Sequence, residues 1–427
     1  MDDVSAPAGE GDQARATAEA VARRHYGKLV AFLAARTRDV AGAEDALSEA
    51  FAAALARWPT DGIPDNPEAW ILAVARRKTI DAARRRRSSQ AAEPDLQLIA
   101  EELETVAADV TQIPDQRLAL MFACAHPAID AATRAPLMLQ TILGFDAAAI
   151  ASAFLVAPAT MSQRLVRAKG KIRQAGIPFR VPEPAELRER LDAVLEAIYA
   201  VFAEGWADAA GTDARRRNLA EEGIWLGRLV VSLMPDEPEA LGLLALMLHA
   251  EARRVARRNS SGDYVPLADQ DPGLWDAQLL DEAEALLRRA SRKGVLGRFQ
   301  LEAAVQSAHV VRRRSGQSDW AAIERLYDAL LALTGSPVVE INRAIALAET
   351  RGPAAGLAAL DALADDARVA EYQPYWAARA GLLGRIGDRA GADEAYRLAI
   401  GLELDPSVRA FLQQRQTALR PPGRDKS

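Results

Sequence analysis

Side chains that could do catalytic or metal chemistry are few and widely spaced in this sequence of 427 residues. Its one cysteine, Cys124, comes two positions before His126, and side chains two residues apart on a helix point in different directions. No second ligand stands at metal-site spacing from the remaining histidines, which are His25, His249 and His309. The sequence also lacks a Gly-rich phosphate loop and a nucleophile elbow. It therefore predicts a protein that is not an enzyme and that uses no metal and no cofactor.

Arginine and lysine are instead concentrated in two segments of the first 180 residues. Residues 68–88 have a net charge of +5, and residues 158–180 have six basic residues and no acid. The whole chain carries −6, but residues 1–180 are neutral in total, so the excess of acid lies in the remainder. Each basic segment is dense enough to contact phosphates. Nucleic acid is therefore a candidate partner despite the acidic total.

The first basic segment is predicted to be a helix preceded by a loop. Residues 59–67 are rich in Pro, Gly and Asp, and Asn66 followed by proline is typical of a helix cap and first position. On this helix Trp70 falls on the buried side, whereas Asp81 and Arg84 fall on another. An aromatic ring beside a polar loop is a surface that binds unstacked bases. The alternative is a solvated basic helix end, which the helix dipole favours.

The second basic segment is predicted to be the second helix of a helix-turn-helix motif. A short helix capped by Asp146, a break at 155–157 and a helix beginning at Pro158 match this motif. The inward apolar positions of the second helix are Met161, Leu165 and Ala168. Its outward positions are Thr160, Gln163, Arg164, Arg167 and Lys171. This face suits phosphates and base edges. A helix that simply faces solvent is the alternative, and it explains the absence of acid less well.

A third group of residues lies on a helix predicted before the first basic segment. It consists of Asp45, Leu47, Glu49 and Phe51. Asp45 and Glu49 have the spacing of an ordinary exposed pair, and the two apolar residues fit a core. By chemistry alone this group has no assigned function.

The elements that must position these residues are predicted to be helices throughout. Helix formers dominate, alanine is abundant, and no stretch alternates apolar and polar residues as a strand does. We expect an all-α protein with a flexible tail over 1–16, helical domains over 17–88 and 115–180, a linker over 89–114 and a helical extension over 183–420. Within the extension Gly316, Gly352 and Gly387 recur at a spacing typical of tetratricopeptide repeats.

The composition also predicts where the protein works. A single cysteine excludes an internal disulfide and favours a reducing compartment. The first residues, MDDVSAPAGEGD, are acidic where a signal peptide would be basic. No apolar run approaches the length of a membrane span. We therefore expect a soluble, cytoplasmic protein with no membrane partner.

The order of these features resembles the extracytoplasmic-function (ECF) sigma factors of bacterial RNA polymerase. The pieces AEDALSEAFAAAL and PEAWILAVARRKTIDAARRR resemble sigma region 2, and residues 115–177 resemble region 4. FACAHPAI, TMSQRLVRAK and IPFRVP are most similar to the subgroup with a long C-terminal, tetratricopeptide-like extension. YAVFAEGW and HAEARRVARRNSSGDYVPLADQDPGLWD resemble motifs of that extension. Ala203, Trp206 and Ala250 depart from them.

The resemblance implies a role for each group of residues. The helix that docks on core RNA polymerase matches Asp45, Leu47, Glu49 and Phe51. The part that reads and melts the −10 promoter element matches Asn66, Trp70, Arg76, Lys78, Asp81 and Arg84. The −35 recognition helix matches Thr160, Ser162, Gln163, Arg164, Arg167 and Lys171. The expected partners are core RNA polymerase and promoter DNA, and the expected function is to direct transcription initiation.

Two questions stay open at the level of sequence. A regulatory scaffold with a helix-turn-helix and tetratricopeptide-like repeats, acting without polymerase, is the alternative function. The extension over 183–420 either inhibits the two DNA-binding domains or is required by them, and a protein partner of its own is expected. The acidic excess of this part fits inhibition of the basic domains. The segment IPFRVPEP ties the extension closely to the recognition helix and favours a regulatory role that is also needed for activity.

Overall fold

The computed structural model describes residues 8–87, 116–154, 156–207, 214–311, 316 and 318–419. Within these ranges the regular elements are helices, with one isolated backbone bridge between Arg258 and Tyr264. The predicted all-α fold is therefore confirmed. The chain forms two compact units, of which the first ends at Gly223 and the second begins at Ile224. The predicted linker over 89–114 lies outside the described residues.

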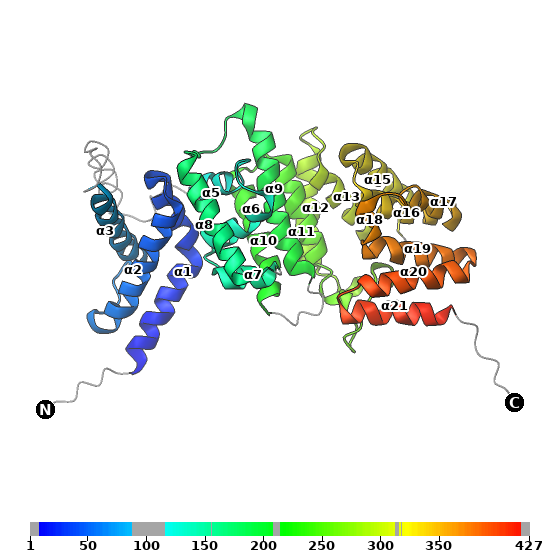
Figure 1. The fold of residues 1–427 in the computed structure, drawn as a ribbon, viewed down its shortest axis with the longest axis horizontal. Coiled ribbons are helices and arrows are strands. Elements are labelled where there is room, and N and C mark those ends of the chain that lie inside the picture. Colours follow the sequence, from blue (N-terminus) through cyan, green and yellow to red (C-terminus); the bar gives the residue numbers. More distant parts are fainter. Residues whose placement is uncertain are drawn as a thin grey trace. The chain divides into compact units, whose positions relative to one another are not determined.

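The first three helices form a small bundle, which we call the α1–α3 bundle. Its members are α1 (Ala8–Thr37), α2 (Val40–Asp61) and α3 (Pro67–Arg87). They pack against one another in every pairing and lie side by side in Figure 1. The core takes apolar residues from all three helices, among them Leu29, Phe32, Leu47 and Ile71. The three-to-four-residue spacing of these positions gives each helix one buried stripe.

Side-chain caps set where these helices begin. The Asp39 carboxylate accepts a hydrogen bond from the Gly42 amide at 3.1 Å and caps α2. The Asn66 side-chain oxygen accepts from the Ala69 amide at 3.1 Å, so the predicted cap of α3 is confirmed. Such a side chain satisfies one of the amides that a helix start leaves without a partner.

Two boundaries differ from the sequence-based expectation. The expected tail over 1–16 is helical from Ala8 onward, because Ala14 and Ala18 extend the buried stripe of α1. The expected loop over 59–67 is shorter, since α2 continues through Pro59 to Asp61. A proline near the C-terminal end of a helix removes a single hydrogen bond. Gly62 then ends the helix with a φ of +85°, which glycine adopts without strain.

A second bundle, the α5–α8 bundle, follows in the same unit. Its members are α5 (Arg117–Cys124), α6 (Ala131–Leu143), α7 (Ala147–Ala153) and α8 (Pro158–Gln174). The Asp146 carboxylate accepts from the Ala149 amide at 2.7 Å, as predicted for a cap of α7. α7 and α8 follow each other in the chain and pack together, and the assignment of this pair to the helix-turn-helix motif stays a prediction.

The first unit continues beyond the boundary expected at 183. α9 (Pro184–Ala207) packs on α5 and α6, and Val194, Leu195 and Ile198 of α9 are fully buried. The first half of α10 (Ala214–Leu233) also belongs to this unit. Gly223 permits that arrangement, because a Cβ atom there would lie 2.8 Å from the Cβ of Phe202. The compact unit therefore includes the start of the expected extension.

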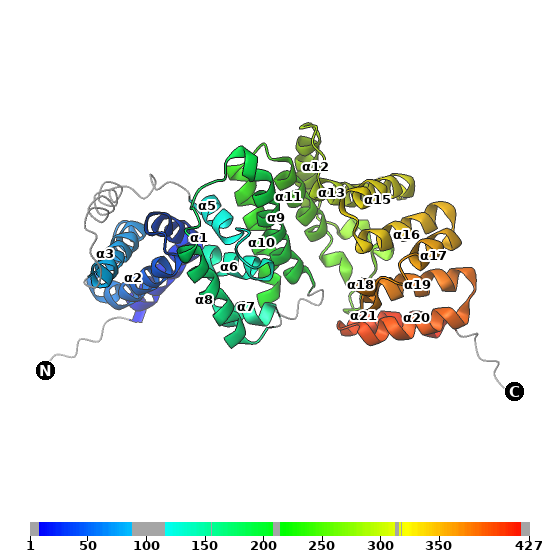
Figure 2. The ribbon, with the colours of Figure 1, turned by 45° about the horizontal axis from the view of Figure 1, so that its top comes forward.

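The second unit is a succession of helices, most of which pack on the next helix along the chain. After α10 come α11 (Pro238–Glu251), α12 (Ala277–Ser291), α13 (Arg298–Val310), α15 (Trp320–Thr334), α16 (Pro337–Arg351), α17 (Pro353–Asp361), α18 (Ala367–Ala370), α19 (Gln373–Ile386), α20 (Arg389–Leu402) and α21 (Pro406–Ala418). Short 3₁₀ turns at 255–257, 267–269 and 272–274 join α11 to α12. Figure 2 shows how the later helices follow one another. This stacking is the arrangement of helical-repeat proteins.

The last helices of this unit bury the small residues of the proposed repeat pattern. Ala380, Ala392, Tyr396 and Ala399 lie in one core with Leu412 of α21. Gly387 ends α19 in the left-handed region at a φ of +88°. These features agree with a helix-turn-helix repeat, and the assignment to the tetratricopeptide class stays a prediction.

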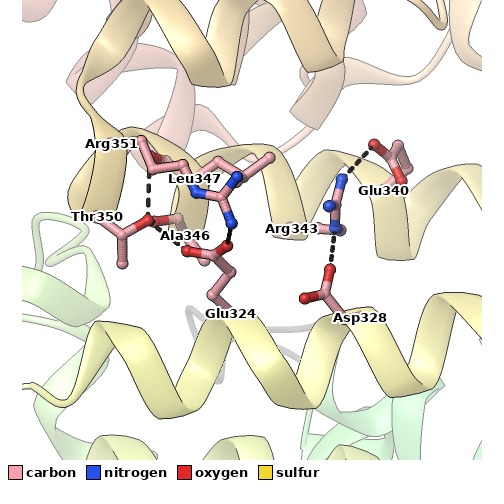
Figure 3. Close-up of polar contacts among 8 residues, drawn as sticks. All are labelled: Glu324, Asp328, Glu340, Arg343, Ala346, Leu347, Thr350 and Arg351. Carbon is pink, nitrogen blue, oxygen red and sulfur yellow. Dashed lines mark hydrogen bonds and ion pairs between the residues drawn. The ribbon is translucent and has the colours of Figure 1, made fainter.

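Polar contacts also join neighbouring helices of the second unit, as between α15 and α16 in Figure 3. Glu324 is 7% exposed, and its carboxylate accepts hydrogen bonds from the Thr350 hydroxyl, at 2.5 Å, and from the Arg351 guanidinium. On the same face Arg343 donates to Asp328 at 2.5 Å and to Glu340 at 3.2 Å. A buried carboxylate is tolerated because its oxygens have partners.

Candidate nucleic-acid interface

The tryptophan predicted to bind an unstacked base is held in place by a second tryptophan. Trp70 of α3 is half-buried, and its ring lies 5.5 Å from the ring of the buried Trp58 of α2 in an edge-to-face arrangement. Aromatic pairs favour this geometry, which fixes the orientation of the half-exposed ring. The capping residue Asn66, which is exposed, lies one helical turn before Trp70. The pair thus presents part of one aromatic ring beside a polar loop.

The other predicted −10 residues follow along α3. Arg76 is half-buried, whereas Lys78 and Asp81 are exposed. The ammonium of Lys78 lies 2.8 Å from the carboxylate of Glu49 on α2. The side chain of Arg84 lies outside the described residues. The structure therefore places four of the six predicted residues with exposed or half-buried side chains along α3 and a fifth, Asn66, at its start.

The residues predicted to bind polymerase do not all reach the surface. Asp45 and Glu49 are exposed and Phe51 is half-buried, but Leu47 is fully buried in the core of the α1–α3 bundle. Leu47 is therefore a packing residue in this structure. Leu55, one turn after Phe51, is 48% exposed and extends the surface of α2 with an apolar side chain. Leu55 follows Phe51 by four residues, and this helical spacing is the signal in the sequence that places the two side chains on one side of α2.

The helix predicted to recognise the −35 element has the expected inward and outward sides. Met161, Leu165 and Ala168 of α8 are buried. The predicted DNA-contacting side chains are exposed except for Arg164, which is half-buried; the exposed ones are Thr160, Ser162, Gln163, Arg167 and Lys171. Because the apolar stripe attaches α8 to its bundle, the polar face is available for a ligand.

This polar face borders a cavity of about 580 Å³ in the α5–α8 bundle. Arg164, Arg167 and Lys171 line it from α8, and Asp130 and Thr133 line it from the start of α6. The Asp130 carboxylate already accepts from the Ala132 amide at 3.0 Å and serves as the cap of α6. Three cations and one occupied carboxylate leave the lining positive. Such a concave basic surface suits phosphate oxygens, which arginine and lysine bind through charge-assisted hydrogen bonds.

Cys124 and His126, the side chains with the most reactive chemistry in this bundle, have the surroundings of structural residues. Burial raises the pKa of the Cys124 thiol to about 12, and its sulfur lies 3.4 Å from the Thr141 hydroxyl. His126 accepts a hydrogen bond from the Ala128 amide at 3.1 Å, and burial together with nearby arginines lowers its pKa. Among the described residues no three His, Cys, Asp or Glu side chains are grouped as a metal site would require. Nor is any helix in the described ranges both long and apolar enough to cross a membrane.

Comparison with known proteins agrees with the N-terminal part of this description. The sequence profile of sigma-70 region 2 matches residues 21–89, the segment that contains most of the α1–α3 bundle. Sigma-70 proteins are transcription factors without catalytic activity, which is consistent with the prediction that this chain is not an enzyme. A second profile, a family of unknown function called DUF6596, matches residues 190–291. That match covers α9 to α12 and thus parts of both compact units.

A comparison over nearly the full length comes from a bacterial relative. An uncharacterized protein of Rhizobium meliloti (strain 1021) is 39% identical over 376 residues, which cover 87% of this chain and 88% of that protein. No solved structure matches the chain. The chain belongs to the same family as this Rhizobium protein, and its sigma-70 region 2 supports a sigma factor that takes part in transcription initiation.

Proposed function

We propose that this chain is an ECF sigma factor that binds core RNA polymerase through α2 and reads a −10 element with α3 and a −35 element with α8. The observation that supports this most is the outward face of α8. This face follows a sigma-70 region 2 in the chain and borders the cavity lined by Arg164, Arg167 and Lys171. Its helix packs on α7, and we interpret the pair as a helix-turn-helix. A second DNA-binding module behind region 2 is what recognition of two promoter elements requires.

The side chains of α8 and α3 suit the two helices to different parts of the DNA. On α8 the long basic residues are suited to guanine edges and phosphates in the major groove. On α3 the half-exposed ring of Trp70 is suited to a base that has left the duplex. Stacking on an aromatic ring contributes about 1–3 kcal/mol per base, which offsets the free energy of unstacking. The factor thus contributes binding energy, and polymerase contributes catalysis.

The surface of α2 supports this function over that of a DNA-binding scaffold that acts without polymerase. Asp45 and Glu49 are exposed acids on one side of α2, and the partly exposed Phe51 and Leu55 lie on an adjoining side, on the following turns. A scaffold has no need of this face. A sigma factor needs it, because an acidic and apolar helix surface can dock on a basic and apolar partner surface.

The test is transcription in vitro with purified core polymerase and the double variant Asp45→Lys with Glu49→Lys. We expect core binding in a pull-down and transcription to fall together by tenfold or more, on the order of 1.4 kcal/mol of lost interaction. Glu19→Lys is the control, since Glu19 is an acid on a different helix, α1, and is 60% exposed. Unchanged core affinity in the double variant, with the wild-type chain active, would contradict the docking assignment. A wild-type chain that binds DNA but never polymerase would favour the scaffold.

A further inference from the structure

The segment between α11 and α12 carries a motif that the proposed sigma function does not use. Residues 249–276, HAEARRVARRNSSGDYVPLADQDPGLWD, include four arginines. The Asp276 amide donates to the Ala252 carbonyl oxygen at 2.9 Å and closes the segment into a loop, which we call the α11–α12 loop. Inside it the Val265 amide donates to the Arg257 carbonyl oxygen at 2.9 Å. These backbone contacts give the four arginines defined positions in the second unit.

Two of the four arginines form ion pairs. The Arg254 guanidinium lies 2.7 Å from the Glu251 carboxylate. The Arg258 guanidinium lies 2.8 Å from the carboxylate of Asp405, the residue that caps α21. The ring of Tyr264 also packs edge-to-face on a phenylalanine ring of α21, with the ring centres 5.5 Å apart. The α11–α12 loop is therefore attached to α21 at two points, one polar and one aromatic.

Arg253 differs from these two arginines because its partners are neutral. Its Nε donates to the His249 carbonyl oxygen at 3.3 Å, and its Nη2 donates to the Gln306 side-chain oxygen at 2.5 Å. In the part of the chain that the structure describes, no carboxylate lies at ion-pair distance from Arg253, and its Nη1 donates to no residue. Burial and the nearby Arg257 lower the pKa of Arg253 to about 10. An anion at this guanidinium would stabilise its charge.

Two tyrosine hydroxyls lie within electrostatic reach of the same guanidinium. They belong to Tyr264 of the loop and to Tyr327 of α15, and both side chains are half-buried. Neither hydroxyl donates a hydrogen bond to any residue in the described ranges. We call Arg253 and these two tyrosines the Arg253 site. A guanidinium nitrogen with two hydroxyl donors is a set of groups that suits the oxygens of a carboxylate.

The acids nearest to this site already have partners of their own. Glu302 lies near Tyr327 and forms an ion pair with Arg298 at 2.8 Å. Glu403 lies near Tyr264 and accepts a hydrogen bond at 2.8 Å from the backbone amide two residues later. Neither carboxylate is at ion-pair distance from the guanidinium of the site. The site therefore keeps a positive charge that an external carboxylate can match.

Large apolar side chains are exposed on the segments around the Arg253 site. Val255 is 71% exposed on the 3₁₀ turn at 255–257, and Leu274 is 52% exposed on the turn at 272–274, which contacts the first turn. Leu404, which precedes the α21 cap, is 82% exposed. We call these three residues the apolar rim. An ion pair that is open to solvent contributes little affinity by itself, so a tight ligand must also use apolar contacts.

We propose that the Arg253 site binds an aspartate or glutamate side chain of a partner protein, and that the apolar rim contacts apolar residues beside that acid in the partner. The match of charge and the exposed rim favour a peptide segment over a small organic acid, which offers the carboxylate alone. The site lies within the second unit. The proposal therefore does not depend on the proposed contacts with promoter DNA or with polymerase.

The test starts with the full-length chain and a displayed library of random twelve-residue peptides. Peptides selected on the wild type should be enriched in Asp or Glu with apolar neighbours. One selected peptide, labelled with fluorescein, is then titrated by fluorescence anisotropy. Tyr264→Phe and Tyr327→Phe should each weaken its binding by about tenfold, because each removes one hydrogen bond to a charged group. Their melting temperatures should stay unchanged, since the lost hydroxyls donate to no described residue.

Matched variants separate the site from a general effect. Tyr372→Phe is the control, because Tyr372 is half-buried in another core of the second unit and its hydroxyl likewise donates to no described residue. It should bind the peptide as the wild type does. Arg253→Gln should abolish binding. If Arg253→Gln does not fold, the two tyrosine variants still test the site.

Three results would contradict the proposal. The first is a selection without acidic peptides, and the second is wild-type affinity in both tyrosine variants. The third is N-acetylglutamate that binds the full-length chain as tightly as the selected peptide does, which would identify a small organic acid as the ligand in place of a partner protein. Replacing the acidic residues of the peptide by their amides should remove its binding, and retained binding would exclude the carboxylate as the recognised group.

Discussion

Residues of the same type have different roles in this protein because their surroundings differ. Trp58 and Trp70 are twelve positions apart in the chain, yet one is a core residue and the other has part of its ring exposed. Lys169 and Lys171 are neighbours on α8, yet one is paired with a buried carboxylate and the other lines the basic cavity. The direction of a helical side chain decides between these roles.

A buried histidine gives a prediction at the same scale. His249 of α11 is fully buried, and burial lowers its pKa to about 3, although the Glu284 carboxylate lies 3.5 Å away. The unfolded chain binds this proton near pH 6.5, whereas the folded chain stays neutral, so the free energy of unfolding falls as the pH drops from 6.5 toward 3. At pH 5 this group should cost about 2 kcal/mol relative to pH 7.

The variant His249→Met lacks the titrating ring but keeps a side chain of similar volume. We expect it to lose about 2 kcal/mol less than the wild type between pH 7 and pH 5 in urea denaturation. The comparison uses the difference between the two chains, so that acids and bases common to both cancel. An identical pH dependence would show that His249 finds a partner for its proton in the folded state.

At the scale of elements, α8 combines three functions on three sides. Met161, Leu165 and Ala168 attach it to its own bundle, Lys169 and Arg173 attach it to α2, and the remaining basic residues line the cavity. A helix has enough angular room for this division, because successive residues are rotated by about 100°. Its neighbours therefore decide how much of a basic helix is available to DNA.

The cavity side of α8 leads to a prediction about DNA binding. Arg164→Ala and Arg167→Ala should each weaken binding to a −35 duplex, because both side chains line the cavity. An arginine that is bidentate to guanine should cost about 1–3 kcal/mol and relax the preference at one base pair. One that contacts phosphate should weaken all sequences alike and reduce the salt dependence.

Footprinting and titrations at several salt concentrations separate these two results. Gln174→Ala is the control, since Gln174 is an exposed residue of the same helix that does not line the cavity. Wild-type affinity in both arginine variants would remove this face of α8 from the DNA interface.

At the scale of the whole molecule, the compact units do not follow the expected domain boundary. α9 packs on α5 and α6, and α10 contributes residues to both units. The DUF6596 match likewise covers parts of both units. The expected extension therefore begins within the first unit, and a cut after Pro182 would expose the face of α5 and α6 that α9 covers.

Two truncations test this arrangement. A chain ending at Pro182 should unfold at lower temperature or aggregate, because the buried Val194, Leu195 and Ile198 of α9 are lost. A chain ending at Gly223 keeps the residues of the first unit and should retain its helix content. We expect this longer fragment to bind core polymerase, because it keeps α2. We expect it to lose transcription, because it lacks the second unit.

Thermal unfolding and transcription in vitro provide the measurements. Transcription that rises in the fragment ending at Gly223 would instead identify the second unit as an inhibitor. Equal stability of the two fragments would contradict the role of α9 in the first unit.

The sequence by itself determined the all-α fold, the capping residues and the two sides of α8, because these depend on residues within one or two helical turns. Asn66 and Asp146 cap helices as their types predict, and the inward stripe of α8 is buried as its spacing predicts. The basic segments themselves follow from counting charges. Local periodicity contains this information because it reports which side of a helix is apolar.

Only the tertiary structure decided which neighbour covers each side. Leu47 and Leu55 are both apolar positions of α2, yet one is fully buried and the other is 48% exposed, because the packing of α1 and α3 covers only part of that helix. Lys169 meets Glu44 across 125 positions of sequence. A contact over that separation leaves no local pattern, since each partner alone is an ordinary charged residue on a helix. The packing of the α1–α3 bundle on the α5–α8 bundle therefore depends on contacts between residues far apart in the chain.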